Sequence, residues 1–312
     1  MGEPLRPSAS LWDIAAGMKL AALLLLAACG SSSAPVTTPK GPEAPAKAAF
    51  TPTAFTVQVT GSGRPVIFIP GLASPGSVWD GAVAHLGGKV QAHVLTLAGF
   101  AGVKPIDVPF LQQVHDQIEK YIEANHLDHP LIVGHSLGGV MSLWLAETDP
   151  AISGAIDLDG MPFLASAMDP LATADKASAM AEGMRKQLLA APHDQFVGFM
   201  HQFLAAMVND PANAKMLDEA AEKSDQPTVA NAFAELLEKD LRPDLGKITV
   251  PVTILAAGDS QLPREQLEAS WKAQVDPIPH HQLVIVDGSK HFVMLDKPDV
   301  VYAQLDAALS AK

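Results

Sequence analysis

Hydrophobic residues along the chain fall into short, nearly continuous runs, separated by longer stretches in which apolar positions recur every three or four residues. The short runs have the length and the apolar content of β-strands. They cover residues 55–59, 66–69, 93–97, 131–133, 155–158, 251–255 and 282–286. The longer stretches, among them 111–124 and 140–146, have the periodicity of helices. Strands that alternate with helices predict an α/β protein with a doubly wound, mostly parallel sheet.

The alternation stops between residues 160 and 245, where the pattern is helical throughout. Helices are expected over 173–190, 195–208, 211–222 and 228–241. Seven of the eleven methionines fall in this segment. Their adaptable side chains fit either an apolar pocket that accepts several substrate shapes or ordinary helix–helix packing. The pattern predicts a helical cap (160–245) inserted into an α/β core formed by residues 50–159 and 246–312.

The first 29 residues contain an export signal pattern. Lys19 precedes a short apolar run that ends in small residues before Cys29. This arrangement is typical of a secretory signal, and the run is too short to span a bilayer comfortably. The sequence Leu-Ala-Ala-Cys29 also resembles the bacterial lipoprotein signal, in which the cysteine is acylated after cleavage before it. A plain cleaved signal peptide is the alternative. Residues 1–17 lack signal character, and we expect Met18 to be the true start.

Acylation of Cys29 would hold an exported domain at a membrane through lipid alone. Gly30 stands where an aspartate would indicate retention at the inner membrane, so the resemblance implies the outer membrane. Residues 30–49 are rich in Ser, Pro, Ala and Thr and have no periodicity, and we expect them to form a disordered tether.

Composition excludes several classes of function. The net charge of −13 argues against nucleic acid and anionic lipid headgroups as partners, because no basic stripe is available to bind them. The single cysteine cannot form an intramolecular disulfide. No histidines have the H-x-x-x-H or H-E-x-x-H spacing of metal ligands, and the G-x-G at 61–63 precedes a strand rather than a helix. Neither a metal nor a nucleotide cofactor is therefore expected, and the oligomeric state stays open.

Candidate chemistry centres on Gly134-His-Ser136-Leu-Gly138, a G-x-S-x-G motif between an apolar strand and a helix. At such a tight turn the serine takes a strained backbone conformation, and there is no room for side chains on the two glycines. The hydroxyl is raised above the edge of the sheet, where the start of the helix also directs its N–H groups. Ser136 is therefore the candidate nucleophile.

Two later loops carry the partners that a serine nucleophile needs. Asp259 and His291 each follow a predicted strand, so the chain order is Ser, Asp, His. Histidine has a pKa near neutrality and can accept the serine proton, and a carboxylate fixes the imidazole tautomer. Asp157 and Asp159, at the end of the preceding strand, are the alternative acids, and Asp159 is the better placed of the two.

These stretches resemble the α/β-hydrolase superfamily, in its capped, esterase-like branch, from about Phe50 to the end of the chain. The matching pieces are Pro70-Gly71-Leu72 with Trp79, Gly99-Phe-Ala-Gly102, Gly134-His-Ser-Leu-Gly138, Asp259-x-x-x-Pro263, and Gly288-Ser-Lys-His291-Phe292 followed by Pro298. The resemblance implies a triad of Ser136, His291 and Asp259. It also implies an oxyanion hole formed by the backbone N–H groups of Leu72 and Leu137.

The same resemblance makes His135 a packing residue beside the nucleophile rather than the base. Trp79 and Met161 are the candidate pocket residues. One position departs from the family pattern, because Pro70 stands where a histidine often precedes the glycine of the oxyanion loop. Another departure is Ala256, which replaces a glycine three residues before the predicted acid.

Taken together, these residues predict a carboxylesterase-like serine hydrolase that cleaves ester or related acyl bonds of small apolar substrates through an acyl-enzyme. A peptidase, lactonase, thioesterase or carbon–carbon hydrolase of the same fold is the alternative, because one fold supports many reactions. A different class also stays open, namely a lipoprotein that binds a hydrophobic ligand without catalysis. The expected partner of the enzyme is a small-molecule acyl substrate.

Overall fold

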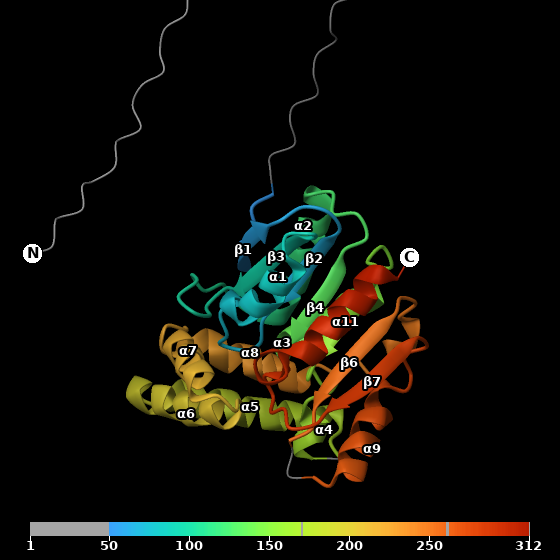
Figure 1. The fold of residues 1–312 in the computed structure, drawn as a ribbon. Coiled ribbons are helices and arrows are strands. Elements are labelled where there is room, and N and C mark those ends of the chain that lie inside the picture. The colour runs from blue at the N-terminus through green and yellow to red at the C-terminus, as the bar shows by residue number, and fades with distance from the viewer. Residues whose placement is uncertain (1–49, 170, 260–261, 312) are drawn as a thin grey trace, which may run out of the picture. The chain divides into compact units, whose positions relative to one another are not determined.

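The computed structural model describes residues 50–169, 171–259 and 262–311, and its centre is one seven-stranded sheet (Figure 1). The strands are β1 (Phe55–Thr60), β2 (Pro65–Ile69), β3 (Gln91–Leu97), β4 (Leu131–His135), β5 (Gly154–Leu158), β6 (Val252–Ala257) and β7 (His281–Val286). Their order in the sheet is β1-β3-β2-β4-β5-β6-β7. Only β1 runs antiparallel to its neighbour, so the predicted mostly parallel sheet is confirmed.

Burial explains why the central strands were continuous apolar runs in the sequence. Every residue of β2, β4 and β5 is buried, because helices cover both faces of the sheet there. Gly134 of β4 lies opposite Ile69 of β2 on one side and Asp157 of β5 on the other. This register brings the carboxyl ends of the three strands to the same edge.

Helices pack on the two faces of the sheet. On one face lie α1 (Asp80–Leu86) and α11 (Pro298–Ser310), and on the other lie α2 (Phe110–Ala124) and α3 (Leu137–Thr148) (Figure 1). The helix α9 (Arg264–Val275) packs beside β7. Of these, α1, α9 and α11 were not predicted, since short or weakly amphipathic helices leave little periodic signal.

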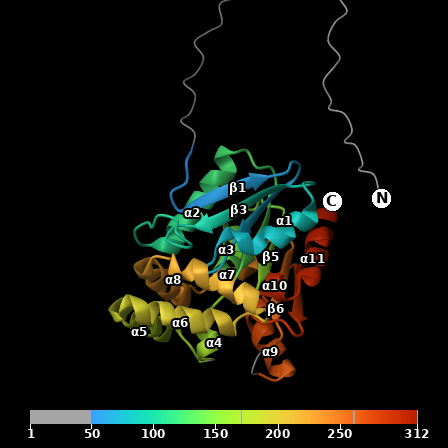
Figure 2. The same ribbon diagram turned by 60° about the vertical axis from the view of Figure 1, so that its left-hand side comes forward.

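Five α-helices of the described residues lie between β5 and β6 in the sequence, and we call residues 160–245 the helical insertion. They are α4 (Ala165–Met168), α5 (Ala174–Ala190), α6 (His193–Ala206), α7 (Pro211–Glu222) and α8 (Gln226–Glu238). Figure 2 shows the longer ones stacked beyond one end of the sheet. Thr173 caps α5 by accepting the N–H of Lys176, and Asp225 caps α8 by accepting the N–H of Thr228.

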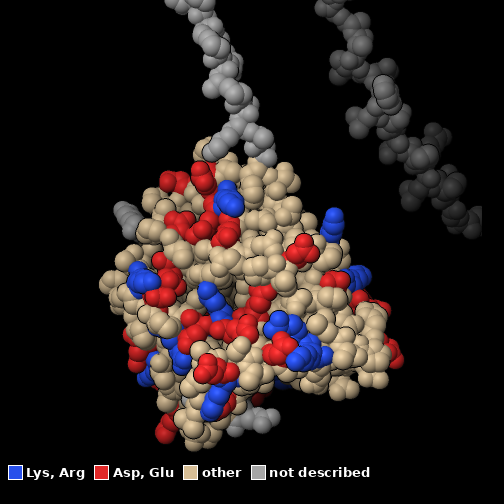
Figure 3. Space-filling model, turned by 180° about the vertical axis from the view of Figure 1, so that it is seen from behind, with Lys and Arg blue, Asp and Glu red and all other residues tan. Residues whose placement is uncertain are grey.

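Charged side chains of both signs are interspersed on the surface. On the face in Figure 3, Lys and Arg lie among Asp and Glu without forming a basic stripe. Ion pairs such as that between Lys247 and Asp244 join neighbouring charges of opposite sign on the surface.

Candidate active site

The turn between β4 and α3 holds Ser136 in an unusual backbone conformation, with φ 56° and ψ −118°. Positive φ is costly for a residue with a side chain, so the surrounding structure must enforce it. The two glycines of the motif allow the close approach that does so. A Cβ on Gly134 would overlap the carbonyl oxygen of Gly138, and a Cβ on Gly138 would overlap that of Ile69. The motif therefore folds as its sequence predicted.

His291, in the loop after β7, is hydrogen bonded through Nδ1 to Oδ2 of Asp159 at 2.6 Å. Asp159 follows β5 directly and also has a positive φ, 57°. Its other carboxylate oxygen accepts the N–H of Ala257 at 2.8 Å. Both oxygens of Asp159 are thus held, and the carboxylate fixes the proton of His291 on Nδ1. In neutral His291, Nε2 is then left as the proton acceptor.

The structure does not bring the predicted acid, Asp259, to His291. The side chain of Asp259 is exposed, and no hydrogen bond joins it to His291 within the described residues. Its backbone N–H instead donates to the carbonyl oxygen of Ser289 at 2.8 Å. A main-chain hydrogen bond therefore joins the loop after β6 to the loop after β7 that carries His291, which we call the histidine loop. The prediction of Asp259 as the partner of His291 is wrong, and the alternative acid, Asp159, occupies that position.

His135, the residue before Ser136, is a buried packing residue. Its Nε2 donates to the carbonyl oxygen of His291 at 3.1 Å, and its ring lies 4.5 Å from that of Phe292, centroid to centroid. Burial lowers the pKa of His135 well below its usual value, and the proximity of His291 lowers it further. The bond to the carbonyl oxygen acts in the opposite direction. A neutral His135 whose N–H is bonded to the carbonyl oxygen of His291 holds the histidine loop in place, so its role is structural.

Two backbone N–H groups at the site are available for a ligand. Leu72 follows β2 and lines the cavity beside Ser136, and Leu137 is the first residue of α3. Within the described part of the chain, neither N–H donates a hydrogen bond to another protein group. The Leu137 N–H also lies at the positive end of the α3 dipole. These are the two groups that the resemblance of the motifs implied for an oxyanion hole.

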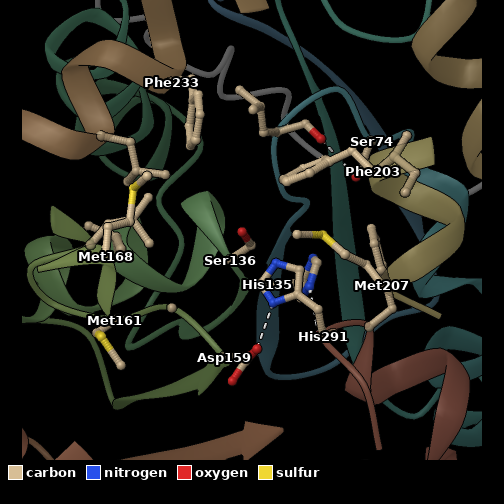
Figure 4. A pocket seen from close by; sticks show the side chains of 17 residues that line it. Ser74, His135, Ser136, Asp159, Met161, Met168, Phe203, Met207, Phe233 and His291 are labelled. Carbon is tan, nitrogen blue, oxygen red and sulfur yellow. Dashed lines mark hydrogen bonds and ion pairs between the residues drawn. The ribbon is translucent and has the colours of Figure 1, made fainter. Parts of the chain in front are cut away.

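A cavity of about 280 Å³ lies between the helical insertion and the carboxyl edge of the sheet. Ser136, His291 and Asp159 lie on one side of it, with methionine and phenylalanine side chains around them (Figure 4). The insertion contributes Met161, Leu164, Met168, Phe203, Leu204, Met207, Phe233 and Leu236. Phe203 and Phe233 were not singled out from the sequence, because helical periodicity shows that a side chain is buried without showing which cavity it borders.

Of the two predicted pocket residues, the structure places one at the cavity and one elsewhere. Met161 lines the cavity. Trp79 does not, and that prediction is wrong. Its side chain is completely buried, with the ring centroid 5.3 Å from that of Phe68 in β2. A large aromatic residue close to a site loop in sequence is thus part of the core beneath it.

The segment between α6 and α7 holds the histidine loop. The carbonyl oxygen of Met207 accepts the N–H of Phe292 at 3.2 Å. Asn209 Nδ2 donates to the carbonyl oxygen of Gly288 at 3.1 Å, and Lys290 Nζ donates to that of Val208 at 3.2 Å. The helical insertion therefore forms part of the cavity wall and also supports the loop that carries His291.

One group of residues in the described part of the chain has metal-ligand chemistry, and it lies outside the cavity. His115, Asp116 and Glu119 on α2 place possible ligand atoms within 4.8 Å of one another. Both ring nitrogens of His115 already have hydrogen-bond partners, Asp116 at 3.2 Å and Thr148 at 2.9 Å. Its ring also stacks on Trp144. These contacts are those of a structural histidine.

The chain belongs to the alpha/beta hydrolase family, whose model matches residues 66–304. That range includes the sheet from β2 onward, the helical insertion and all the residues around the cavity. The resemblance inferred from the motifs is therefore confirmed at the level of the superfamily.

Curated relatives of this chain include several hydrolases. A pimeloyl-[acyl-carrier protein] methyl ester esterase of Nitrosomonas europaea is 23% identical over 258 residues, which are 80% of this chain and 98% of the relative. A 3-oxoadipate enol-lactonase of Acinetobacter baylyi is 22% identical over 251 residues, 78% of this chain and 89% of the relative. Esterase and lactonase names among its relatives support a hydrolase.

Solved structures show the same fold. A hydrolase from Pseudomonas aeruginosa PA01 superposes with a TM-score of 0.68 and 16% identity, covering 82% of this chain and 94% of the other. An enol-lactonase from Burkholderia xenovorans has a TM-score of 0.61 and 14% identity, covering 82% of this chain and 96% of the other. At these identities the likeness concerns the fold alone.

Proposed function

We propose that the protein is a serine hydrolase that cleaves carboxylic ester bonds of small apolar substrates through an acyl-enzyme. The observation that supports this most directly is the hydrogen bond between His291 and Asp159 in a cavity that also contains Ser136. In this proposal Ser136 attacks the carbonyl carbon while His291 takes its proton. Asp159 stabilises the imidazolium, and His291 then protonates the leaving alcohol.

The N–H groups of Leu72 and Leu137 would hold the oxygen of the tetrahedral intermediate. Each such donor contributes roughly 3–4 kcal/mol to transition-state stabilisation in serine proteases. Water attacks the acyl-enzyme in the second half of the reaction, with His291 as the base, and the carboxylic acid leaves. No group beyond these side chains and backbone amides is required for either half.

The cavity supports an apolar acyl or alcohol group on the substrate. Its wall is mostly Met, Phe and Leu. The polar or charged residues that line it are Ser74, His135, Ser136, Asp159 and His291. A volume of about 280 Å³ lies near the lower end of the range for small-molecule pockets. We therefore propose ester substrates with short or medium acyl chains. The enol-lactonase among the curated relatives favours a cyclic ester as the second candidate.

The test combines an activity probe with a substrate series. The protein should react with a fluorophosphonate probe and hydrolyse p-nitrophenyl esters, with the highest kcat/KM at short or medium chain length. A protein that binds hydrophobic ligands without catalysis would be neither labelled nor active. Labelling without ester turnover, but with turnover of a lactone series, would favour the second candidate.

We also propose that the protein is exported as a lipoprotein acylated at Cys29 and located at the outer membrane. Support comes from the signal pattern in the sequence alone, because residues 1–49, which include Cys29 and the expected tether, lie outside the described residues. Within the described residues, no helix combines the length and the apolar character needed to cross a membrane.

A further inference from the structure

A second carboxyl group lies directly beneath the candidate active site, and the proposed mechanism does not use it. Asp157 is in β5, opposite Gly134 of β4, and is fully buried. Its Oδ1 accepts the N–H of Gly160 at 2.8 Å. Its Oδ2 has no hydrogen-bond partner in the described part of the chain. A buried polar atom without a partner is costly, so this carboxyl group requires an explanation beyond packing.

Two glycines make room for the Asp157 carboxyl group between the serine turn and the turn after β5. A Cβ on Gly139, in the first turn of α3, would overlap Asp157 Oδ1. A Cβ on Gly160 would lie 2.5 Å from the same oxygen and 2.6 Å from the carbonyl oxygen of Ser136. The Asp157 carboxyl group therefore packs closely against the backbone of Gly139 on one side and of Gly160 on the other.

We propose that Asp157 is a positioning residue for Asp159. Through its bond to the Gly160 N–H, it holds the turn of residues 158–160 in the conformation that directs the Asp159 carboxylate to His291. Asp159 has a positive φ, which is strained for a residue with a side chain. Hydrogen bonds on the N-terminal and C-terminal sides of Asp159 must therefore hold this conformation. On one side its own N–H donates to the carbonyl oxygen of Leu255 at 2.9 Å. On the other side, the bond between Gly160 and Asp157 supplies the restraint.

The electrostatics agree with this role. Burial raises the pKa of Asp157 well above its usual value, and the nearby Asp159 raises it further, while the Gly160 N–H acts in the opposite direction. A neutral carboxyl group still accepts the Gly160 N–H through its carbonyl oxygen. It also places no second negative charge beside Asp159. The role therefore requires a hydrogen-bond acceptor of this shape, and a neutral amide should substitute for it.

The test compares Asp157→Asn, which keeps the shape and the acceptor, with Asp157→Ala, which removes both. The matched control is Ser153→Ala. It removes a buried hydroxyl that has no hydrogen-bond partner among the described residues and that lies just before the first residue of β5, at the end away from Asp159. Two readouts are used: kcat and KM for a p-nitrophenyl ester, and the proton NMR signal of His291 Nδ1–H without substrate. The NMR readout reports the bond between Asp159 and His291 directly.

Asp157→Asn and Ser153→Ala should keep the wild-type kcat and NMR signal. Asp157→Ala should lower kcat by about 10- to 100-fold with little change in KM, since a small displacement of a catalytic group has effects of this size. Its His291 Nδ1–H signal should move upfield and exchange faster with solvent.

A wild-type kcat and signal in Asp157→Ala would overturn the inference, and so would an Asn variant as impaired as the Ala variant. Should Asp157→Ala fail to fold, Asp157→Val replaces it, because a β-branched apolar residue suits a strand and carries no acceptor. The inference gives Asp157 a catalytic consequence only if the proposed function is correct. The NMR arm needs no substrate, so folded wild-type protein without hydrolase activity would refute the function and still test the positioning.

Discussion

Oδ2 of Asp159 lies 2.6 Å from Nδ1 of His291, although 132 residues separate the two in the chain. They extend from β5 and β7, which are not neighbours, because β6 lies between them in the sheet. The histidine loop must therefore cross the end of β6 to reach the turn after β5. The Asp259 segment at the end of β6 forms a main-chain contact with this loop.

Replacing the candidate nucleophile should remove activity without unfolding the protein. We expect Ser136→Ala to lower kcat for p-nitrophenyl esters by at least about 10⁴-fold and to abolish fluorophosphonate labelling. The free energy of unfolding should change by less than about 1 kcal/mol, because Ser136 is only half-buried and the loss of its hydroxyl removes little packing. Urea denaturation measures this second quantity. Near wild-type turnover in a folded variant would place the nucleophile elsewhere.

Replacement of the two candidate acids, Asp159 and Asp259, should have very different effects on kcat. Asp159→Asn should lower kcat by roughly 10³- to 10⁴-fold, because an amide cannot hold the imidazole tautomer that accepts the serine proton. Asp259→Asn, the matched control, should stay within about twofold of the wild type, since an exposed side chain away from the imidazole contributes little. Steady-state kinetics on both variants decides the matter. The opposite ranking would mean that the loop after β6 rearranges when substrate binds.

Two phenylalanines on α6 allow a controlled test of the cavity. Phe203 lines it, whereas Phe199, one turn earlier, is 42% exposed and stacks on Phe203 from outside. Phe203→Ala should enlarge the cavity and raise kcat/KM for long-chain esters, relative to short-chain esters, by about tenfold or more. Phe199→Ala should leave the chain-length preference unchanged. An identical shift in both variants would indicate loosening of α6 rather than a larger cavity.

The raised pKa of Asp157 predicts an unusual pH dependence of stability. The folded protein keeps a proton on this group at a pH where the unfolded chain has released it. Stability contributed by the protonated group is therefore lost as pH rises from near 4 to the raised pKa, by up to about 1.4 kcal/mol per pH unit. Asp157→Asn should remove this loss. The Tm of the variant minus the Tm of the wild type should therefore increase as pH rises from 4 to 7. A constant difference in Tm would show that Asp157 is ionised in the folded state.

The proposed lipid anchor depends on a single cysteine. Cys29→Ser should abolish incorporation of a fatty-acid analogue, and the variant should remain as precursor or be cleaved elsewhere and released. Ester hydrolysis by the catalytic domain should be unaffected, because residues 30–49 separate Cys29 from it. Metabolic labelling with membrane fractionation provides the measurement. Wild-type protein that is unlabelled and fully soluble would contradict the lipoprotein proposal and leave the hydrolase proposal intact.

The sequence by itself determined the strands and the serine turn. The central strands could be read because burial on both faces leaves continuous apolar runs, and all seven predicted strands are present. The turn at Ser136 could be read because Gly134 and Gly138 must lack side chains for β4 and α3 to meet so closely. Both features depend on residues close together in the chain, so contiguous sequence carries the information.

Only the tertiary structure decided which side chains meet at the site. Asp159 and Asp259 both follow strands that end at the same edge of the sheet, so sequence order left either able to reach His291. Asp159 is the partner of His291 because its left-handed backbone conformation directs its carboxylate to the imidazole. Asp259 contacts the histidine loop through its backbone N–H, and its side chain stays exposed. The position of Trp79 also depends on tertiary packing, because its ring packs on Phe68 of β2 in the core. The direction of a side chain at the end of a strand is set by loop conformation and by contacts from distant segments, which no local pattern records.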